Sequence, residues 1–347
     1  MIVPCYNVEL YLERCLKSIL NQTIGRENLE LILVNDASTD HTLSVMLDYE
    51  KQYEEDILVV NCDKNGKQGT ARNIGLQYAT CEYVGFVDAD DWIESTMYEK
   101  LYTKAKELDC DRVGCFYDRV SCEGEAEKNS KSRSKDKTEK YINVCNDRDR
   151  KEYLTWKEGG GIWSSIYRRS VIVDNQIFFP ENLIYEDNYW SALMRFYEKN
   201  IYVTNEVLYH YFTNPNSVTL RRNNTDLLDR LVVETMKMQE YKKRGIYSKF
   251  QEQLDKEFIE LYWKNSLHTF FFQLDYFPVG LLKEMQKTVK EEVSMQLLQK
   301  IKDVGKWYYS LLYEENITQE ELNGIQTRYV NECMKMANGK NIFEGDM

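Results

Sequence analysis

Residues 86–92 read FVDADDW and place three carboxylates, Asp88, Asp90 and Asp91, within four positions. They directly follow the apolar run YVGFV, which is typical of a buried strand. Because carboxylates this close repel one another, the cluster either shares a cation or lies in open water. Two acids one residue apart can hold a hard cation whose other ligands are water and phosphate oxygens. A solvated turn in which Asp90 or Asp91 caps the next helix is the alternative, and the motif alone leaves both open.

The chain around this stretch alternates between strand and helix patterns. Short apolar runs predict strands, and three- and four-residue apolar spacing or good capping residues predict the helices between them. The expected strands are 29–34, 57–61, 83–87 and 112–117, and the expected helices are 8–20, 38–53, 69–80 and 95–108. Continuous apolar strands that alternate with helices indicate an α/β domain with a parallel sheet covered on both faces.

Polar residues collect where the expected strands end. Tyr6 and Asn7 follow the first short apolar run, Asn35 and Asp36 follow the second, and the three acids follow YVGFV. In open α/β sheets the carboxyl ends of the strands form the edge where ligands bind. The sequence therefore predicts a ligand site that includes the acidic cluster.

The loop Asn65–Gly75 (NGKQGTARNIG) supplies a cation near that edge. Its glycines permit a tight turn before a helix, and Arg72 falls in the first turns of that helix, where it can meet a phosphate or orient the acids. The loop is not a P-loop, because no G-K-[ST] occurs. A surface ion pair at Arg72 is the alternative.

Composition excludes several classes of protein. The 347 residues carry a formal net charge of -12, which argues against a nucleic-acid binder that neutralises phosphates. Nine cysteines without a C-x-x-C pair indicate thiols in a reducing cytosol. Neither a signal peptide nor an apolar run of 18 residues is found, so we expect a cytoplasmic protein without a transmembrane segment, with possible peripheral contact at the inner face of the membrane.

Together these motifs resemble family 2 glycosyltransferases of the GT-A fold. Pro4-x-Tyr6-Asn7, Asn35 to Asp40, the Asn65–Gly75 loop and Asp88-Ala89-Asp90-Asp91 stand in the order and spacing of that family. The resemblance implies an inverting transferase that uses a UDP-sugar and Mn²⁺ or Mg²⁺. It also implies a donor site formed by Pro4, Tyr6, Asp36, Arg72, Asp88 and Ala89, with Asp36 on the uracil, Asp88 at the ribose or metal-bound water, and Asp90 on the metal.

The resemblance also suggests a catalytic base and a third metal ligand. Glu186-Asp187 looks like the Glu-Asp pair of the family, which implies Asp187 as the base and Glu186 as a neighbour that orients the acceptor. An N-cap role of Asp187 is the alternative. His210 stands where some relatives complete the metal shell, and a histidine satisfied in the core is the alternative.

Four further features bear on the acceptor and on stability. Trp163 is either a stacking platform for an acceptor sugar or a core residue, and Ser165 stands where the family often has Lys. Arg221 and Arg222 either touch phosphates or carry surface charge. Met1-Ile2-Val3 is nearly all of the first strand, and such a short strand is expected to lower stability.

The expected organisation is a GT-A domain at 1–222 followed by a C-terminal all-α helical module at 223–347. Residues 121–150 are polar and charged and are expected to form an exposed insertion. Apolar and aromatic stripes in the module, including HTFFFQLDYFPVGLL, indicate bundle core, self-association as a homo-oligomer or a membrane-facing patch.

The leading hypothesis is transfer of a sugar from a UDP-sugar to a saccharide, polyol-phosphate or lipid-linked acceptor in cell-surface polysaccharide, teichoic acid or glycolipid assembly. A catalytically impaired fold that acts as a binding or scaffold module is one alternative. A nucleotidyltransferase is another, since related sheets bind nucleotides in the same crevice.

Overall fold

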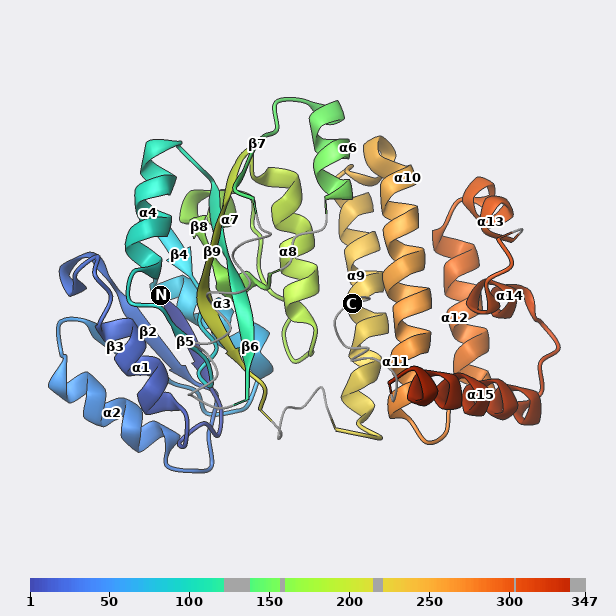
Figure 1. The fold of residues 1–347 in the computed structure, drawn as a ribbon, viewed down its shortest axis with the longest axis horizontal. Coiled ribbons are helices and arrows are strands. Elements are labelled where there is room, and N and C mark those ends of the chain that lie inside the picture. The colour runs from blue at the N-terminus through green and yellow to red at the C-terminus, as the bar shows by residue number, and fades with distance from the viewer. Residues whose placement is uncertain (122–137, 157–159, 215–220, 303, 338–347) are drawn as a thin grey trace. The chain divides into compact units, whose positions relative to one another are not determined.

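A computed structural model describes residues 1–121, 138–156, 160–214, 221–302 and 304–337. The chain divides into two compact units, Met1–Pro215 and Asn216–Met347. The predicted boundary between residues 222 and 223 therefore falls slightly inside the second unit. Figure 1 shows the first unit in blue to yellow and the second in yellow to red.

The parallel part of the sheet lies in the N-terminal half of the first unit. Strands β1 (Ile2–Cys5), β2 (Leu31–Asn35) and β3 (Ile57–Asn61) pair in parallel in the order β1-β2-β3. A parallel bridge from Ile2 to Phe86 joins β1 to the chain just after β4 (Tyr83–Gly85). Every residue of β1 and β2 is buried, as expected for strands covered on both faces. The first strand is short, as predicted, yet all four of its residues pair with β2.

The rest of the sheet is mixed, so the prediction of a purely parallel sheet is wrong for this half. Its strand order is β4-β8-β6-β9-β5, in which β8 (Ser165–Arg168) runs antiparallel to both neighbours. Strand β6 (Arg112–Val120) pairs in parallel with the long strand β9 (Asn200–Phe212), and β5 (Trp92–Ile93) pairs antiparallel with β9. Strand β8 was not predicted, because it has only four residues and begins directly after the 3-10 turn Ile162–Ser164, so the sequence shows no continuous apolar run there.

Helices cover this sheet, and two close contacts fix their positions. Among the described residues of the first unit the helices are α1 (Leu12–Leu20), α2 (Thr42–Gln52), α3 (Lys67–Tyr78), α4 (Met97–Glu107), α6 (Asp147–Thr155), α7 (Arg169–Asp174) and α8 (Glu186–Tyr197), with a 3-10 turn at Arg26–Asn28. Gly75 brings α3 against β1, because a Cβ there would lie 2.4 Å from the Ile2 side chain. Trp190 of α8 packs edge-on against Phe86 and is stacked 5.1 Å from Phe179, so α8 is anchored in the core.

The expected exposed insertion contains regular structure in its second half, which corrects that prediction. Residues 122–137 lie outside the described part of the chain. After them, β7 (Lys140–Asn143) pairs antiparallel with β9, and α6 begins at Asp147. Val144 and Tyr153 are buried with Ile201 and Val203. Charge in this segment did not mean exposure, because Arg150 is buried and donates to the carbonyls of Arg195 and Glu198.

The second unit is helical, as predicted for this region. It contains α9 (Asp229–Lys243), α10 (Tyr247–Phe258), a π-helical segment (Ile259–Asn265), α11 (Ser266–Gln273), α12 (Val279–Glu292), α13 (Met295–Lys302), α14 (Trp307–Tyr313) and α15 (Gln319–Ala337), after a 3-10 turn at Thr225–Leu228. None of the helices in the described ranges is long and apolar enough to cross a bilayer.

Bundle core is the interpretation that the structure supports for the aromatic stretch at 268–282. Phe270, Phe271 and Phe277 are fully buried and pack on one another. Phe272 and Tyr276 remain exposed. Three of the four phenylalanines of the stretch are therefore packed inside their own unit.

Candidate active site

The carboxyl edge of the parallel strands carries a strained backbone. Four non-glycine residues there, Asn7, Ala37, Lys67 and Tyr185, adopt positive φ angles of 52°, 57°, 62° and 67°. Each follows a strand or begins a helix that borders the predicted site. Such backbone conformations are costly and cluster at ligand sites, which favours this edge of the sheet as the functional site.

Asp36 sits at the end of β2 against the loop that opens α3. One carboxylate oxygen accepts a hydrogen bond from the backbone N–H of Gly66 at 2.7 Å, and the backbone carbonyl accepts one from the Asn65 side chain at 3.3 Å. Burial raises the pKa of Asp36, and the Gly66 N–H lowers it in part. Pro4 is buried in β1, while the ring of Tyr6 just beyond is 47% exposed. The two side chains predicted to hold a nucleobase thus lie at adjacent strand ends.

The acidic stretch forms a tight turn rather than a helix cap. The N–H of Asp91 donates to the carbonyl of Asp88 at 3.0 Å, and α4 begins only at Met97, after Thr96. Arg14 of α1 donates to the carbonyl of Asp90 at 2.7 Å, and Asn214 donates to the Asp90 carboxylate at 3.1 Å. The capping alternative is therefore wrong.

Burial and like charges raise the pKa of two carboxyl groups in the turn. For Asp91, burial raises the pKa well above its usual value, and the charges of Asp88 and Asp90 add to the shift. For Asp90, burial raises the pKa and the neighbouring charge of Asp88 raises it further. Ala89 between them is buried. A carboxylate whose pKa is raised by a like charge gains stability when a cation is shared between the two acids.

Arg72 is the centre of the site. Its side chain is 2% exposed and its Nη2 lies 2.8 Å from Oδ1 of Asp88, while its Nη1 contacts Oε1 of Glu186. Gln68, one helical turn earlier, accepts from the same Nη2 at 3.3 Å. Burial alone would lower the pKa of Arg72, but nearby carboxylates raise it. The alternative of a surface ion pair is therefore wrong, because Arg72 is a buried cation that joins two acidic elements.

Glu186 and Asp187 open helix α8. Burial raises the pKa of Glu186 to about 7, although Arg72 opposes this shift. Burial also raises the pKa of Asp187, which Arg72 lowers and Asp88 raises. Tyr185, and not Asp187, occupies the N-cap position, so the N-cap alternative for Asp187 is wrong.

Close packing of α3 on α8 brings these acids to Arg72. A Cβ on Gly69 would lie 2.4 Å from the carbonyl oxygen of Pro180 and 3.0 Å from Cγ of Glu186. Only a residue without a side chain allows this approach. The glycine in the predicted loop thus positions the helix that carries the candidate base.

His210 faces away from the turn. Its Nδ1 lies 2.7 Å from Asp118 and its Nε2 lies 3.0 Å from Glu94, and the ring stacks on Trp92 at 5.3 Å. Burial would lower its pKa, but the two carboxylates raise it to about 9. A protonated imidazole has no lone pair for a metal.

The predicted metal set of Asp88, Asp90 and His210 is not assembled in the structure. Within the described ranges, no three His, Cys, Asp or Glu side chains form a group that could hold a metal ion. Successive side chains of a strand alternate in direction, and Tyr209 of β9 is the residue that reaches the acidic turn. His210 therefore serves as a core residue with two carboxylate partners, the alternative interpretation.

Trp163 and Arg222 also follow their simpler interpretations. The indole is 9% exposed, stacks on Tyr209 at 4.3 Å and meets Tyr117 edge-on at 4.7 Å. Ser165, two residues on, is buried in β8. Arg222 forms an exposed ion pair with Asp275 at 2.8 Å.

Four side chains that shape the site are not among the predicted site residues: Arg14, Gln68, Tyr209 and Asn214. Gln68 stands inside the recognised loop, one turn before Arg72, so its spacing was a usable signal. Arg14 lies on α1, Tyr209 lies in β9 and Asn214 lies two residues after that strand. These three reach the turn only through tertiary contacts, which have no local signal in the sequence.

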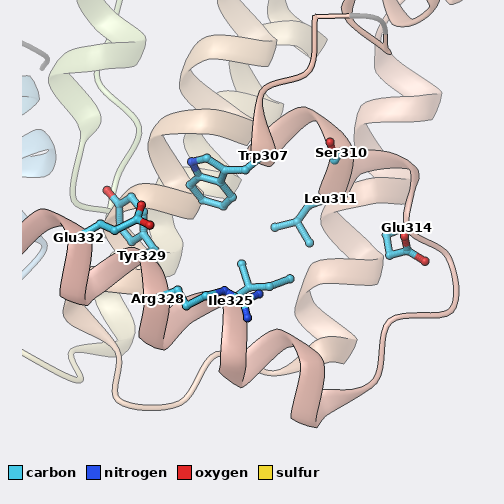
Figure 2. A pocket seen from close by; sticks show the side chains of 8 residues that line it. All are labelled: Trp307, Ser310, Leu311, Glu314, Ile325, Arg328, Tyr329 and Glu332. Carbon is cyan, nitrogen blue, oxygen red and sulfur yellow. The ribbon is translucent and has the colours of Figure 1, made fainter.

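A separate cavity of about 410 Å³ lies in the helical unit (Figure 2). Its lining comes from α14, the chain after it and α15: Trp307, Ser310, Leu311, Glu314, Ile325, Arg328, Tyr329 and Glu332. The cavity thus shares no lining residue with the acidic turn.

Comparison with known proteins matches this geometry to a family. The description "Glycosyl transferase family 2" fits residues 1–174. The uncharacterized glycosyltransferase EpsJ of Bacillus subtilis is 32% identical over 226 residues, covering 63% of this chain and 62% of EpsJ. This chain therefore spans about three fifths of that relative's length. The minor teichoic acid biosynthesis protein GgaB of Bacillus subtilis is 44% identical over 101 residues, or 29% of this chain and 11% of GgaB.

A solved structure agrees with the fold of the whole chain. The crystal structure of S. aureus TarS 1-349 in complex with UDP-GlcNAc superposes with a TM-score of 0.65 at 20% identity, covering 97% of this chain and 91% of that one. The likeness extends over both units and shows a GT-A fold followed by helices. Family match and fold together lead to one conclusion: this chain is a member of glycosyltransferase family 2.

Proposed function

We propose that the chain is an inverting glycosyltransferase that moves a sugar from a UDP-sugar to an acceptor hydroxyl by metal-assisted direct displacement. The observation that carries the proposal is the buried network in which Arg72 joins Asp88 of the acidic turn to Glu186 beside Asp187. This network brings a candidate donor site and a candidate base to the same cation. Family membership supports the reaction class.

A nucleoside diphosphate is proposed to bind along the edge from β1 to the acidic turn. Asp36 would accept from the uracil N–H, with Tyr6 packing on the base and Pro4 and Ala89 shaping the backbone beside it. The complex of TarS with UDP-GlcNAc makes a uridine donor the first choice for this chain. A carboxylate has several acceptor positions, so Asp36 can accept the uracil N–H in addition to the backbone N–H of Gly66.

Asp88 and Asp90 fit a divalent cation, and we propose that Asp90 ligates it and Asp88 supports it directly or through water. The fit rests on the raised pKa of Asp90 beside Asp88, because a bound cation would relieve their repulsion. Oxygen ligands suit both Mg²⁺ and Mn²⁺. When bound, the cation would stabilise the charge of the departing diphosphate.

Asp187 is proposed as the base. It would take the proton from the acceptor hydroxyl while the acceptor oxygen attacks the anomeric carbon and the bond to UDP breaks with its electron pair. Glu186 is held by Arg72, which suits it to orient the acceptor rather than to exchange protons. Burial makes Asp187 a stronger base than an exposed carboxylate, since its pKa is raised.

The acceptor is proposed to be a saccharide, polyol-phosphate or lipid-linked hydroxyl of a cell-surface polymer. Similarity to a teichoic acid biosynthesis protein supports this class. We further propose that the enzyme works in the cytoplasm, at the inner face of the membrane. Within the described residues the eight cysteines form no disulfide, which fits a reducing compartment.

The test is release of nucleoside diphosphate from UDP-glucose, UDP-galactose and UDP-GlcNAc, with and without Mn²⁺, by the wild type and by Asp90→Asn. Metal-dependent UDP release that Asp90→Asn abolishes supports the proposal. Release of pyrophosphate from a nucleoside triphosphate and sugar phosphate would identify a nucleotidyltransferase instead. Absence of both activities, together with no thermal stabilisation by UDP and Mn²⁺, would favour a scaffold.

A further inference from the structure

One hydroxyl group of β9, that of Tyr209, makes hydrogen bonds to both ends of the acidic turn at Asp88–Asp91. The Tyr209 hydroxyl accepts a hydrogen bond from the backbone N–H of Asp88 at 3.2 Å and donates to Oδ2 of Asp91 at 2.6 Å. The second Asp91 oxygen accepts from the N–H of Phe212 at 2.7 Å. The two ends of the turn are thus tied to the same strand.

Both carboxylate oxygens of Asp91 are occupied by these hydrogen bonds, so Asp91 is poorly placed to bind a ligand. It is 0% exposed, and both of its oxygens receive hydrogen bonds from β9. Asp88 and Asp90 differ, because they contact Arg72 and Asn214 near the site. The three acids of the turn therefore divide into two that face the site and one that anchors the turn.

Tyr209 is itself held rigidly. Its side chain is 0% exposed, and Trp163 stacks on the ring at 4.3 Å. Its hydroxyl has a single proton, which it donates in the hydrogen bond to Asp91, so a lone pair of the oxygen is left to accept from the Asp88 N–H. The direction of both hydrogen bonds is therefore fixed by chemistry rather than by choice of rotamer.

We infer that Tyr209 and Asp91 form a positioning pair that sets the separation of the Asp88 and Asp90 carboxylates for a metal-bound diphosphate. This inference rests on the proposed function, because it names residues that prepare the same site. Neither residue touches the reacting atoms. Sites that bind metals require their ligands to be oriented by surrounding hydrogen bonds, and loss of such partners commonly weakens binding 10- to 100-fold.

Tyr209→Phe is the direct test, because it removes one hydroxyl and keeps the ring that packs on Trp163. The matched control is Tyr83→Phe, which removes a hydroxyl that donates to the Cys110 carbonyl at 2.8 Å near the other end of the same sheet region. Tyr209→Phe loses two hydrogen bonds and Tyr83→Phe loses one, so the control measures the cost of removing a tyrosine hydroxyl away from the turn. Only Tyr209→Phe should act on the turn.

Two readouts separate positioning from mere packing. Binding of Mn²⁺ in the presence of UDP, followed by the electron paramagnetic resonance of free Mn²⁺, should weaken about tenfold in Tyr209→Phe and stay within twofold of wild type in Tyr83→Phe. Hydrogen exchange of the peptide that covers residues 88–91 should quicken only in Tyr209→Phe. Unchanged Mn²⁺ affinity and exchange in Tyr209→Phe would overturn the inference.

A double-mutant cycle with Asp91→Asn tests whether the two residues act together. Because Tyr209→Phe removes the donor and Asp91→Asn removes the charge of the acceptor, each single change weakens the same hydroxyl–carboxylate contact, and the double variant should bind Mn²⁺ no more than about twofold more weakly than the weaker single variant. Multiplicative losses would show that the residues act separately and would overturn the pairing. If the wild type itself binds neither UDP nor Mn²⁺, the proposed function fails, a result distinct from a wild type that binds and a Tyr209→Phe variant that binds equally well.

Discussion

Arg72 and Glu186 form a buried ion pair although 114 residues separate them in the chain. The same guanidinium reaches Asp88, so one cation ties the start of α8 to the acidic turn that follows β4. A buried cation with two carboxylate partners is costly to disturb, because removal of one member leaves the others charged and unsolvated. The site and the stability of the first unit are therefore linked through Arg72.

Replacement of Arg72 should damage stability and activity together. Arg72→Ala leaves Asp88 and Glu186 without their cation, and we expect unfolding to become about 3–5 kcal/mol easier. Arg72→Lys keeps the charge but not the planar fork, so it should restore part of the stability while UDP release stays low. Chemical denaturation and a UDP-release assay measure the two effects.

Arg26→Ala is the control for Arg72, because Arg26 makes an exposed ion pair with Asp56 at 2.9 Å. Its loss should change the free energy of unfolding by less than about 1 kcal/mol. An Arg72→Ala variant as stable as Arg26→Ala would contradict the central role of the buried network.

Substitutions of Asp187 and Glu186, the two acids at the start of α8, should have different effects on the kinetics of transfer and on stability. Asp187→Asn keeps the size of the side chain but removes the base, so we expect kcat for sugar transfer to fall at least 100-fold with UDP affinity nearly unchanged. Glu186→Gln removes a charge from Arg72 and should also lower thermal stability. Transfer by Asp187→Asn at a rate near that of the wild type would rule out the assignment of the base.

Gly69 should tolerate no side chain. Gly69→Ala places a methyl group against Pro180 and Glu186, and the resulting displacement of α8 should cost about 1–3 kcal/mol. It should also lower UDP release, because Glu186 and Asp187 move with the helix. Gly324→Ala in α15 is the matched control, since no atom lies within 4 Å of its added methyl group, and it should be neutral or slightly stabilising. Equal melting temperatures for the two variants would count against the close packing.

His210 should make stability depend on pH in the alkaline range. Its pKa is raised from 6.5 in the unfolded chain to about 9 in the fold, so protonation stabilises the native state. This contribution is complete below pH 6.5 and is lost as the pH rises through about 9. At about 1.4 kcal/mol for each pKa unit, the loss is on the order of 3 kcal/mol.

Urea denaturation of the wild type and His210→Gln between pH 6 and pH 10 measures this effect. The difference in unfolding free energy should shrink as the pH rises, and His41→Gln, which alters an exposed histidine, should follow the wild type throughout. A constant difference across this range would show that His210 is neutral in the fold.

The sequence allowed site residues to be predicted where polar or charged side chains directly follow a strand. Asp36 and Asp88 were placed correctly at strand ends, and Arg72 was placed on the helix that follows its loop, because short apolar runs mark strands and the residues after them must lie at the edge. The lining of the turn by β9 was out of reach. Tyr209 reads as one tyrosine among 26, and only the pairing of β9 with β5 brings it under Asp91.

Burial of charge explains the main errors. Residues 138–150 look exposed by composition, yet Arg150 is buried and donates to the carbonyls of Arg195 and Glu198. The position of His210 in the sequence suggested a metal ligand, yet both of its ring nitrogens are hydrogen-bonded to carboxylates, one to Asp118 and the other to Glu94. Charge pairing between distant segments has no local signature, so neither outcome can be read from spacing.

The positive φ angles of Asn7, Ala37, Lys67 and Tyr185 have a consequence for how this chain can diverge. Part of the site's shape is stored in the peptide backbone, so a change to glycine at these positions is the substitution that relieves strain, while valine or isoleucine would aggravate it. A laboratory library that varies the rim of the site should therefore accept Gly, Asn and Asp there and reject β-branched residues. Deep mutational scanning of these four positions would measure this backbone tolerance before any substrate is known.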